Sequence, residues 1–334
     1  MTFPLLSVIP KSRFALAAPH IPSEVAVEHW EDWSDVRRGS PTGFRAVLGV
    51  GLPIPGAVLR APDMELLQLV SASYERVDMA IVREMGLTLC NNPGRNADAV
   101  ADHIVMSLLY FARRMGECQN VVLGDNYHHN REGIIGPLLR DLEEMTVGLV
   151  GFGAIGRSVA DRLHPFGPTL LYHNRTRRRE DEARFGVRYA EFDELLRTAD
   201  AVVAMLPLTA ETKGLFGREA FARMKPETIF VNVGRGALVD QRALVEALLE
   251  HRVYAASLDV FDPEPVTKEN PVVLAAPQLR DRLLLSPHIA GVTHRTWRVM
   301  VQKAIDNVAA YARGEEPHHV VVRGRGRGLA AVGT

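Results

Sequence analysis

The stretch Val147-Gly148-Leu149-Val150-Gly151-Phe152-Gly153-Ala154-Ile155-Gly156 decides the fold. An apolar run with the character of a strand leads into a G-x-G-x-x-G pattern, and residues 157–163 after it predict a helix. In this setting Gly151 turns the chain out of the strand, Gly153 lets the backbone approach a pyrophosphate, and Gly156 lets helix and strand pack closely. Free N–H groups at the helix N-terminus would receive the phosphates. The stretch therefore predicts a dinucleotide site.

The residues at the tip of the next predicted strand determine whether the site prefers NAD(H) or NADP(H). An NAD-type site ends this strand with Asp or Glu, whose carboxylate binds the ribose 2′-hydroxyl. This chain has His173-Asn174-Arg175-Thr176 instead. Because no carboxylate stands there, and because Asn174, Arg175 and Thr176 can donate to a 2′-phosphate, we predict a preference for NADP(H), with NAD(H) also possible. A solvated basic loop is the alternative.

The composition argues against several classes of partner. The net charge of −1 gives no global field for nucleic acid or a membrane, and no apolar run reaches membrane-spanning length. The two cysteines, Cys90 and Cys118, lack paired spacing, so neither a disulfide framework nor a metal cluster is expected. Residues 1–16 are apolar but interrupted by prolines and basic residues, unlike a secretory signal. We expect a cytoplasmic protein with two domains.

The first hundred residues predict a small α/β unit. We expect strands at 5–9, 46–50, 66–71 and 87–90, and a helix at 78–85. After the breaker Asn91-Asn92-Pro93-Gly94, the sequence predicts one long helix over 97–115 and a polar loop over 124–130.

From residue 146 onward, strand and helix patterns alternate, which predicts a doubly wound parallel sheet. Strands are expected at 146–150, 170–172, 201–205, 229–233, 254–258 and 283–286, and helices at 155–164, 180–185, 193–198, 218–224 and 241–250. A final helix over 295–312 is expected to return to the first unit. The terminal Arg323-Gly324-Arg325-Gly326-Arg327-Gly328 predicts a frayed tail, with anion or RNA binding as the alternative.

Three polar segments follow predicted strands, where ligands of doubly wound sheets bind: Gly234-Arg235-Gly236, the run from Asp259 to Glu264, and Pro287-His288. The planar fork of Arg235 suits a substrate carboxylate and would polarise an adjacent carbonyl. His288 would pass a proton to or from the oxygen at the reacting carbon, and Glu264 would orient the imidazole and favour its charged form. A nicotinamide would supply the hydride.

With these motifs the chain resembles the D-isomer-specific 2-hydroxyacid dehydrogenase family, and within it the glyoxylate/hydroxypyruvate and 2-ketogluconate reductase branch. The similarity spans roughly residues 92–293. It includes the segments above together with Asn92-Pro93-Gly94, Leu206-Pro207-Leu208-Thr209-Ala210-Glu211-Thr212 and Leu258-Asp259-Val260-Phe261. The tip His173-Asn174-Arg175 is similar to that of the NADPH-using members.

The resemblance implies two Rossmann-like doubly wound parallel-sheet domains in an α/β fold. Residues 1–96 and 292–334 would form a flavodoxin-like substrate domain, and residues 97–291 the dinucleotide-binding domain. It implies a homodimer, no metal, and a small 2-oxo or 2-hydroxy acid as substrate. The expected reaction is NADPH-dependent reduction of a glyoxylate- or hydroxypyruvate-like 2-oxoacid to the D-2-hydroxy acid.

The resemblance also implies individual roles. Arg235, Glu264 and His288 are the expected catalytic residues, and Asp259 is expected near the nicotinamide carboxamide. The expected cofactor contacts are Gly151, Gly153, Ala154, Ile155, Gly156, Asn174, Arg175, Thr176, Leu206, Pro207, Thr212, Val233, Gly234, Asp259, His288 and Gly291. The expected substrate contacts are Ser73, Tyr74, Arg235 and His288.

The substrate loop departs from the family pattern. Residues 70–78 align with S-x-G-x-D-x-x-D, but Ser73 replaces the Gly and Glu75 replaces the Asp. A Cβ at position 73 restricts a backbone whose N–H groups grip the substrate carboxylate in the family. Tyr74 would either cover the pocket or pack under the loop.

Two other functions remain open from the sequence. A dinucleotide-sensing scaffold similar to the C-terminal-binding-protein corepressors keeps the same three catalytic positions, and turnover would separate it from a reductase. A β-hydroxyacid dehydrogenase relies on a lysine, but none of the five lysines here lies in a pattern that suggests catalysis.

Overall fold

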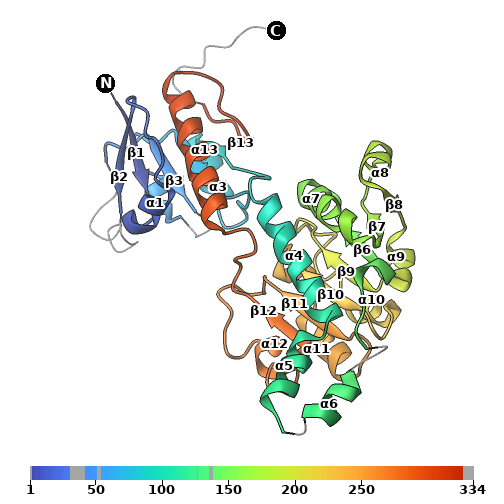
Figure 1. Cartoon of the computed structure of the whole chain (residues 1–334). Helices are drawn as coiled ribbons and strands as arrows, with labels where there is room; N and C mark the ends of the chain where they lie inside the picture. Colours follow the sequence, from blue (N-terminus) through green and yellow to red (C-terminus); the bar gives the residue numbers. More distant parts are fainter. Residues whose placement is uncertain (1, 31–41, 51–53, 126, 135–137, 326–334) are drawn as a thin grey trace. The chain divides into compact units, whose positions relative to one another are not determined.

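The computed structural model describes residues 2–30, 42–50, 54–125, 127–134 and 138–325 (Figure 1). Two compact units divide the chain: Met1–Asn96 with Val292–Thr334 form the first unit, and Ala97–Gly291 form the second. Within the described part of the chain, no helix is long and apolar enough to cross a membrane.

The first unit is built on a six-stranded sheet of order β13-β5-β4-β3-β1-β2. Strands β1 to β5 are parallel in the flavodoxin-like order 2-1-3-4-5, and β13 runs antiparallel to β5. The strands are β1 (Phe3–Ser7), β2 (Val25–His29), β3 (Ala46–Gly49), β4 (Leu66–Leu69), β5 (Thr88–Cys90) and β13 (Val320–Val322). The helices are α1 (Lys11–Ala17), α2 (Gly56–Leu59), α3 (Met79–Met85) and α13 (His294–Ala312).

Each face of this sheet carries its own core, because successive strand residues point to opposite faces. Leu5 packs in the core that includes α1 and α13, whereas Leu6 packs in the core that includes α2 and α3. Trp297, near the start of α13, is buried, and its indole N–H donates to the carbonyl of Arg13 at 2.9 Å. The C-terminal helix therefore belongs to the first unit.

The second unit is a seven-stranded, fully parallel sheet of order β12-β11-β10-β9-β6-β7-β8. The order reverses between β6 and β9, the position at which doubly wound sheets bind ligands. Its strands are β6 (Thr146–Val150), β7 (Thr169–His173), β8 (Val187–Tyr189), β9 (Ala201–Ala204), β10 (Ile229–Asn232), β11 (Ala255–Leu258) and β12 (Leu283–Leu285). Its α-helices are α4 (Ala97–Ala112), α5 (Met115–Leu123), α6 (Tyr127–Ile134), α7 (Ala154–Leu163), α8 (Arg179–Phe185), α9 (Phe192–Thr198), α10 (Arg218–Arg223), α11 (Gln241–Leu249) and α12 (Pro271–Ala275). The predicted α/β class is confirmed: the second sheet is fully parallel, and the first is parallel except for β13.

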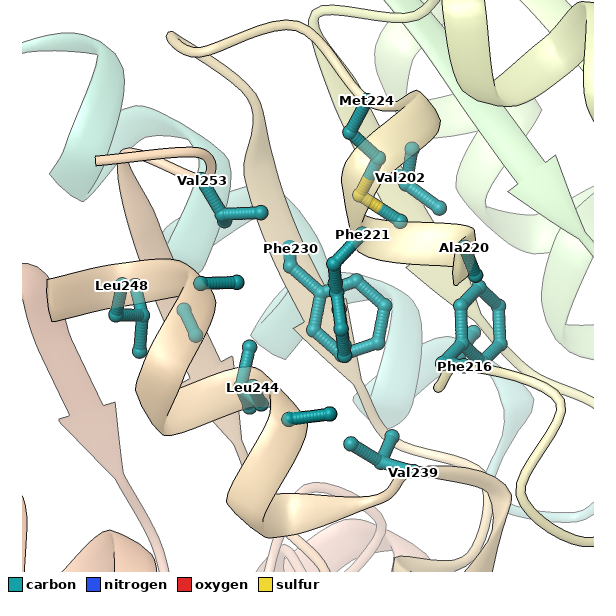
Figure 2. Packing of buried hydrophobic residues seen from close by; sticks show 14 of the residues in the cluster. Val202, Phe216, Ala220, Phe221, Met224, Phe230, Val239, Leu244, Leu248 and Val253 are labelled. Carbon is teal, nitrogen blue, oxygen red and sulfur yellow. The ribbon is translucent and has the colours of Figure 1, made fainter. Parts of the chain in front are cut away.

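Figure 2 shows the core on one face of the second sheet. Phe230 of β10 lies against Phe216 and Phe221, with ring centroids 5.0 and 5.4 Å apart. Its neighbours Ile229 and Val231 belong to the core on the opposite face. Because both faces are covered, the strands read as continuous apolar runs in the sequence.

Local signals explain where several helices begin and end. The Asp78 carboxylate accepts the N–H groups of Ala80 and Ile81 at 3.0 and 3.1 Å, which caps α3. Gly86 ends this helix in the left-handed conformation, with φ 65°. Asp240 caps α11 in the same way as Asp78 caps α3.

Two predictions between residues 97 and 134 are wrong. The single helix over 97–115 is broken, because α4 ends at Ala112 and Arg114 takes a left-handed φ of 45° before α5 begins. The predicted loop over 124–130 overlaps α6, whose polar sequence lacks an apolar stripe. Strands β2 and β8 and the short α1, α2 and α12 were not anticipated.

The predicted frayed tail is wrong for residues 323–325, and residues 326–328 lie outside the described part. Strand β13 pairs with β5, and the N–H of Gly324 donates to the hydroxyl of Thr88 at 3.2 Å. The N–H of Arg325 donates to the carbonyl of Gly86 at 3.0 Å. The sheet edge thus holds this segment in place by hydrogen bonds of the backbone.

Replacing Phe230 with Ala should lower the free energy of unfolding by about 3–5 kcal/mol, because removal of a buried ring leaves a cavity. Phe166→Ala is the control, since the Phe166 side chain is 42% exposed, and it should cost only about 0.5 kcal/mol. Urea unfolding followed by far-UV circular dichroism measures both. Equal costs would contradict the packing in Figure 2.

Candidate active site

The glycine loop after β6 has the shape that a dinucleotide requires. Gly151 has φ 103°, and a Cβ there would lie 3.1 Å from the backbone of Met205. A Cβ on Gly156 would lie 2.9 Å from the carbonyl oxygen of Gly151, so glycine allows α7 to pack this closely. A Cβ on Gly153 would meet nothing within 4 Å, which leaves room for a pyrophosphate.

The N-terminus of α7 is accessible to such a ligand. Gly153 occupies the cap position without a side-chain hydrogen bond, Ala154 is exposed, and Ile155 is half-buried. The first N–H groups of a helix have no partner within the helix, so they are available to an anion. The loop and the helix end together fit the pyrophosphate of a dinucleotide.

Asn174 braces the glycine loop. Its Oδ1 accepts the N–H of Phe152 at 2.7 Å, and its Nδ2 donates to the carbonyl of Phe152 at 3.3 Å. The amide therefore ties the tip of β7 to the loop after β6. One amide hydrogen is left for a ligand, so the predicted donation to a phosphate is limited to that hydrogen.

Arg175 and Thr176 are exposed beyond β7. Hydrogen bonding to Thr209 lowers the pKa of the Glu211 carboxyl, and the charge of Arg175 lowers it further. Arg175 therefore lies within electrostatic range of the loop after β9. Among the described residues it has no hydrogen bond or ion pair, so its guanidinium is available to a ligand.

Arg177 is engaged by the protein itself. Its Nε and Nη2 each donate to one oxygen of Glu182 at 2.7 Å. This bidentate pair, assisted by the hydroxyl of Tyr172, lowers the pKa of Glu182 to about 2. The basic run after β7 thus contains both a structural arginine and an available one.

Residues 206–212 form a self-contained turn after β9. The hydroxyl of Thr212 donates to the carbonyl of Pro207 at 2.8 Å and accepts the N–H of Thr209 at 2.8 Å. Thr212, expected to contact the cofactor, closes this turn. Leu206 is half-buried and Pro207 is exposed at its start.

Two glycines make the Arg235 turn possible. A Cβ on Gly234 would lie 2.8 Å from the side chain of Leu238. A Cβ on Gly236 would lie 2.0 Å from the carbonyl carbon and oxygen of Phe261. The backbone of the Arg235 turn therefore packs directly against the loop that follows β11, and any side chain at position 236 would prevent this contact.

Asn232, which the sequence analysis missed, holds the half-buried Arg235 from both sides. Its Nδ2 donates to the carbonyl of Arg235 at 3.0 Å, and its Oδ1 accepts the N–H of Gly234 at 3.1 Å. Arg235 Nη1 donates to the carbonyl of Gly234 at 2.7 Å. Val233 continues the sheet, donating its N–H to the carbonyl of Ala204 at 3.3 Å.

His288 and Glu264 are in contact. Nδ1 of His288 lies 2.8 Å from Oε2 of Glu264, and Oε1 of Glu264 accepts the N–H of Phe261 at 3.0 Å. The side chains are 48% and 18% exposed, respectively. Because Nδ1 meets the carboxylate, Nε2 is the nitrogen left to exchange a proton with a ligand. Phe261 supports both this pair and the turn of Arg235.

Asp259, which is 2% exposed, fixes the segment that carries His288. Its carboxylate accepts the N–H groups of Ile289 and Ala290 at 2.8 and 2.9 Å and the hydroxyl of Ser286 at 2.6 Å. Its carbonyl accepts the N–H of His288 at 2.8 Å. These bonds hold His288 at φ 56°, a conformation uncommon outside glycine.

Further polar groups support this segment from behind. Nε2 of His103, on α4, lies 3.4 Å from the Ser286 hydroxyl, so Ser286 joins α4 to Asp259. Neither the supporting role of Ser286 nor any role of His103 is predicted from the sequence, because their contact depends on the packing of α4. Gly291, the last residue of the second unit, is buried.

A buried pair of amides positions the loop before Glu264. Gln241 Nε2 donates to the carbonyl of Asp262 at 2.7 Å, and Asn270 Nδ2 donates to Gln241 Oε1 at 2.9 Å. Asn270 also caps α12. The Asn270-Pro271 dipeptide is a helix-start signal that could have identified the cap, although not its partner.

Ser73 and Tyr74 lie in the first unit. The Ser71 hydroxyl donates to the carbonyl of Ser73 at 3.3 Å, and Asn91 Nδ2 donates to the carbonyl of Ala72 at 2.8 Å. Ser73 is not among the described residues with positive φ, so its Cβ causes no strain of that kind. Tyr74 is 39% exposed.

The second unit therefore combines a dinucleotide loop, a supported arginine and an imidazole paired with a carboxylate. Such a set can bind a carboxylic acid and move a proton beside a nicotinamide. In the described part of the chain, no group of three His, Cys, Asp or Glu side chains could hold a metal ion. The arrangement is that of a nicotinamide-dependent oxidoreductase.

Comparison with known proteins identifies the family. Residues 105–290 match the model of the "D-isomer specific 2-hydroxyacid dehydrogenase, NAD binding domain". The chain is 34% identical over 302 residues to glyoxylate/hydroxypyruvate reductase B of Salmonella heidelberg, covering 89% of this chain and 88% of the relative. The homologous reductase of Salmonella newport is 36% identical over 276 residues, covering 81% and 82%.

Solved structures agree. The NAD⁺ complex of D-lactate dehydrogenase from Lactobacillus jensenii has a TM-score of 0.81 and 25% identity, covering 96% of this chain and all of that one. A glyoxylate reductase from Paecilomyes thermophila has a TM-score of 0.77 and 25% identity, covering 96% and 98%. The chain belongs to the D-isomer-specific 2-hydroxyacid dehydrogenase family, as its motifs predict.

Ser286→Ala should lower kcat about tenfold while changing the dinucleotide Kd less than about twofold, because Asp259 loses a hydrogen bond that is worth about 1.5–3 kcal/mol. Ser107→Ala is the matched control, because it removes another serine hydroxyl beside His103. Ser107 lies on α4, where its hydroxyl donates to the carbonyl of His103 and lies 2.9 Å from the hydroxyl of Ser257 on β11. Steady-state kinetics with NADPH and glyoxylate measure both variants. An unchanged kcat in Ser286→Ala would mean that Asp259 holds His288 without this hydroxyl.

Proposed function

We propose that the protein is an NADPH-dependent reductase of a small, glyoxylate- or hydroxypyruvate-like 2-oxoacid, and that it forms the D-2-hydroxy acid. The observation that carries this proposal is the 2.8 Å contact between His288 and Glu264, whose loop also supports the turn of Arg235. The reductases among the relatives support the substrate class. We further propose a homodimer in the cytoplasm, as the family resemblance and the composition suggest.

The chain's own residues would divide the reaction as follows. Arg235 would hold the substrate carboxylate and polarise the neighbouring carbonyl. Nε2 of His288 would give a proton to the carbonyl oxygen, and Glu264 would keep Nδ1 oriented and stabilise the imidazolium. Asp259 would position His288 and, by resemblance, lie near the carboxamide of the cofactor. When bound, the nicotinamide supplies the hydride.

The preference for NADPH rests on the tip of β7. Arg175 is exposed and has no hydrogen bond or ion pair in the described part, and no carboxylate stands at the tip. A guanidinium in this place attracts a 2′-phosphate, and no negative charge at the tip would repel the phosphate. Asn174, at the same tip, accepts the N–H of Phe152 and so ties the tip to the glycine loop.

A dinucleotide-sensing scaffold is not favoured. The two Salmonella relatives are named as glyoxylate/hydroxypyruvate reductases. The ordinary backbone at Ser73 also removes one argument for an impaired substrate loop.

The decisive experiment compares initial rates of NADPH and NADH oxidation against glyoxylate, hydroxypyruvate, pyruvate, phenylpyruvate and 2-ketogluconate. We expect fast turnover with NADPH and a small acid. His288→Gln should lower kcat by about 10²–10⁴ and leave NADPH binding within about twofold. Tight NADPH binding without turnover of any acid would favour the sensor, and an active His288→Gln variant would remove His288 from the mechanism.

Arg175→Ala should raise the Kd for NADPH about 10- to 100-fold and that for NADH less than about threefold, because only NADPH carries the 2′-phosphate. Arg178→Ala is the control, since it removes a neighbouring exposed arginine from the same basic run. Fluorescence titration measures the four dissociation constants. Equal losses for the two dinucleotides would show that Arg175 does not read the phosphate.

A further inference from the structure

The first unit contains a polar cavity of about 230 Å³ that the proposed reaction does not use. It lies between the C-terminal half of α13, the segment after β5 and the residues before β13. The lining comprises Gln68, Asn91, Asn92, Arg95, Lys303, Asp306, Asn307, Ala310, Arg313, Glu315, His318 and His319. We propose that this cavity, which is lined by residues of the first unit alone, binds a small oxyanion that carries carboxylate or phosphate groups.

Hydrogen bonds join several of the polar residues that line the cavity. Asn307, buried on α13, donates through Nδ2 to Gln68 Oε1 at 2.6 Å and accepts the N–H of His318 through Oδ1 at 2.6 Å. The N–H of Asn91 donates to the carbonyl of His319 at 3.2 Å. These bonds join four segments, namely β4, the segment after β5, α13 and the residues before β13, so the cavity does not depend on one loop.

The carboxylates of the cavity already have partners. Both oxygens of Glu315 accept from Arg313, at 2.7 and 2.8 Å, and Arg313 also donates to Glu24 at 2.6 Å. Asp306 accepts from Gln302 at 2.8 Å and lies 3.4 Å from Nζ of Lys303. The negative charges are therefore compensated within the first unit.

Arg95 is different. It is exposed at the rim and, among the described residues, has no hydrogen bond or ion pair. The exposed imidazoles of His318 and His319, with centroids 6.5 Å apart, supply further donors, and one amide hydrogen of Asn91 remains after its bond to Ala72. An available guanidinium among neutral donors favours an anion.

The occupant must be small. The cavity is below the range of about 300–1,000 Å³ for sites of drug-sized ligands. A metal cation is not indicated, because no group of three metal-ligating side chains was found in the described residues. Inorganic phosphate and citrate have the required chemistry and serve as probes.

The test is calorimetric titration of the full chain with phosphate and with citrate at low ionic strength. The Arg235→Gln variant serves as the reference protein, because it removes the expected anion contact of the reductase site. We expect a binding event that persists in this reference and weakens about tenfold or more when Arg95→Gln is added, as for loss of a charge-assisted hydrogen bond. The control adds Arg298→Gln, an exposed arginine on α13 outside the cavity lining, and should retain the affinity.

A thermal shift gives a second readout, because an anion that binds the folded state raises Tm. The shift should persist with Arg298→Gln and diminish with Arg95→Gln, and binding of either probe supports the proposal. It is overturned if neither anion binds the Arg235→Gln reference, or if the Arg95→Gln substitution leaves affinity and shift unchanged. Because no arm measures turnover, failure here leaves the proposed reductase activity unaffected.

Discussion

The buried carboxylate of Asp259 is the interaction on which the candidate active site depends. A buried charge is costly unless hydrogen bonds satisfy it, and here two backbone N–H groups and the hydroxyl of Ser286 do so. The bonds that compensate the charge also fix the backbone on both sides of His288. The imidazole therefore meets Glu264 from a backbone that is held independently of that contact. Burial and positioning are two effects of one set of bonds.

Much of this arrangement is readable from the sequence, because parallel strands end at a common edge. The glycine stretch, the Arg235 turn and the residues after β11 and β12 each follow an apolar run, so their convergence needs only the sheet topology. Gly236 shows what the sequence cannot predict. Its position indicates a turn, but only the structure shows that any side chain there would collide with the backbone of Phe261. A contact between distant backbones leaves no periodic signal.

The remaining differences have the same origin. Asn174 is predicted to contact the cofactor, and the structure adds a second role that the sequence does not indicate, the two hydrogen bonds to Phe152, 22 positions away. His103 reaches Ser286 only because α4 packs near the end of β12. Helix α6 has no apolar stripe by which to recognise it, and Arg114 takes a conformation that its residue type does not favour. In each case tertiary contacts, or their absence, outweigh local preference.

The pairing of β13 with β5 affects how copies of the chain meet in solution. In a parallel sheet the last strand exposes a row of unpaired N–H and C=O groups, which can template association with another molecule. Here Val320–Val322 and the backbone of Gly324 and Arg325 occupy that row on β5. The sheet edge is thereby moved from β5 to β13, which is only three residues long and is followed by Arg323 and Arg325, and a short, charged edge disfavours edge-to-edge aggregation.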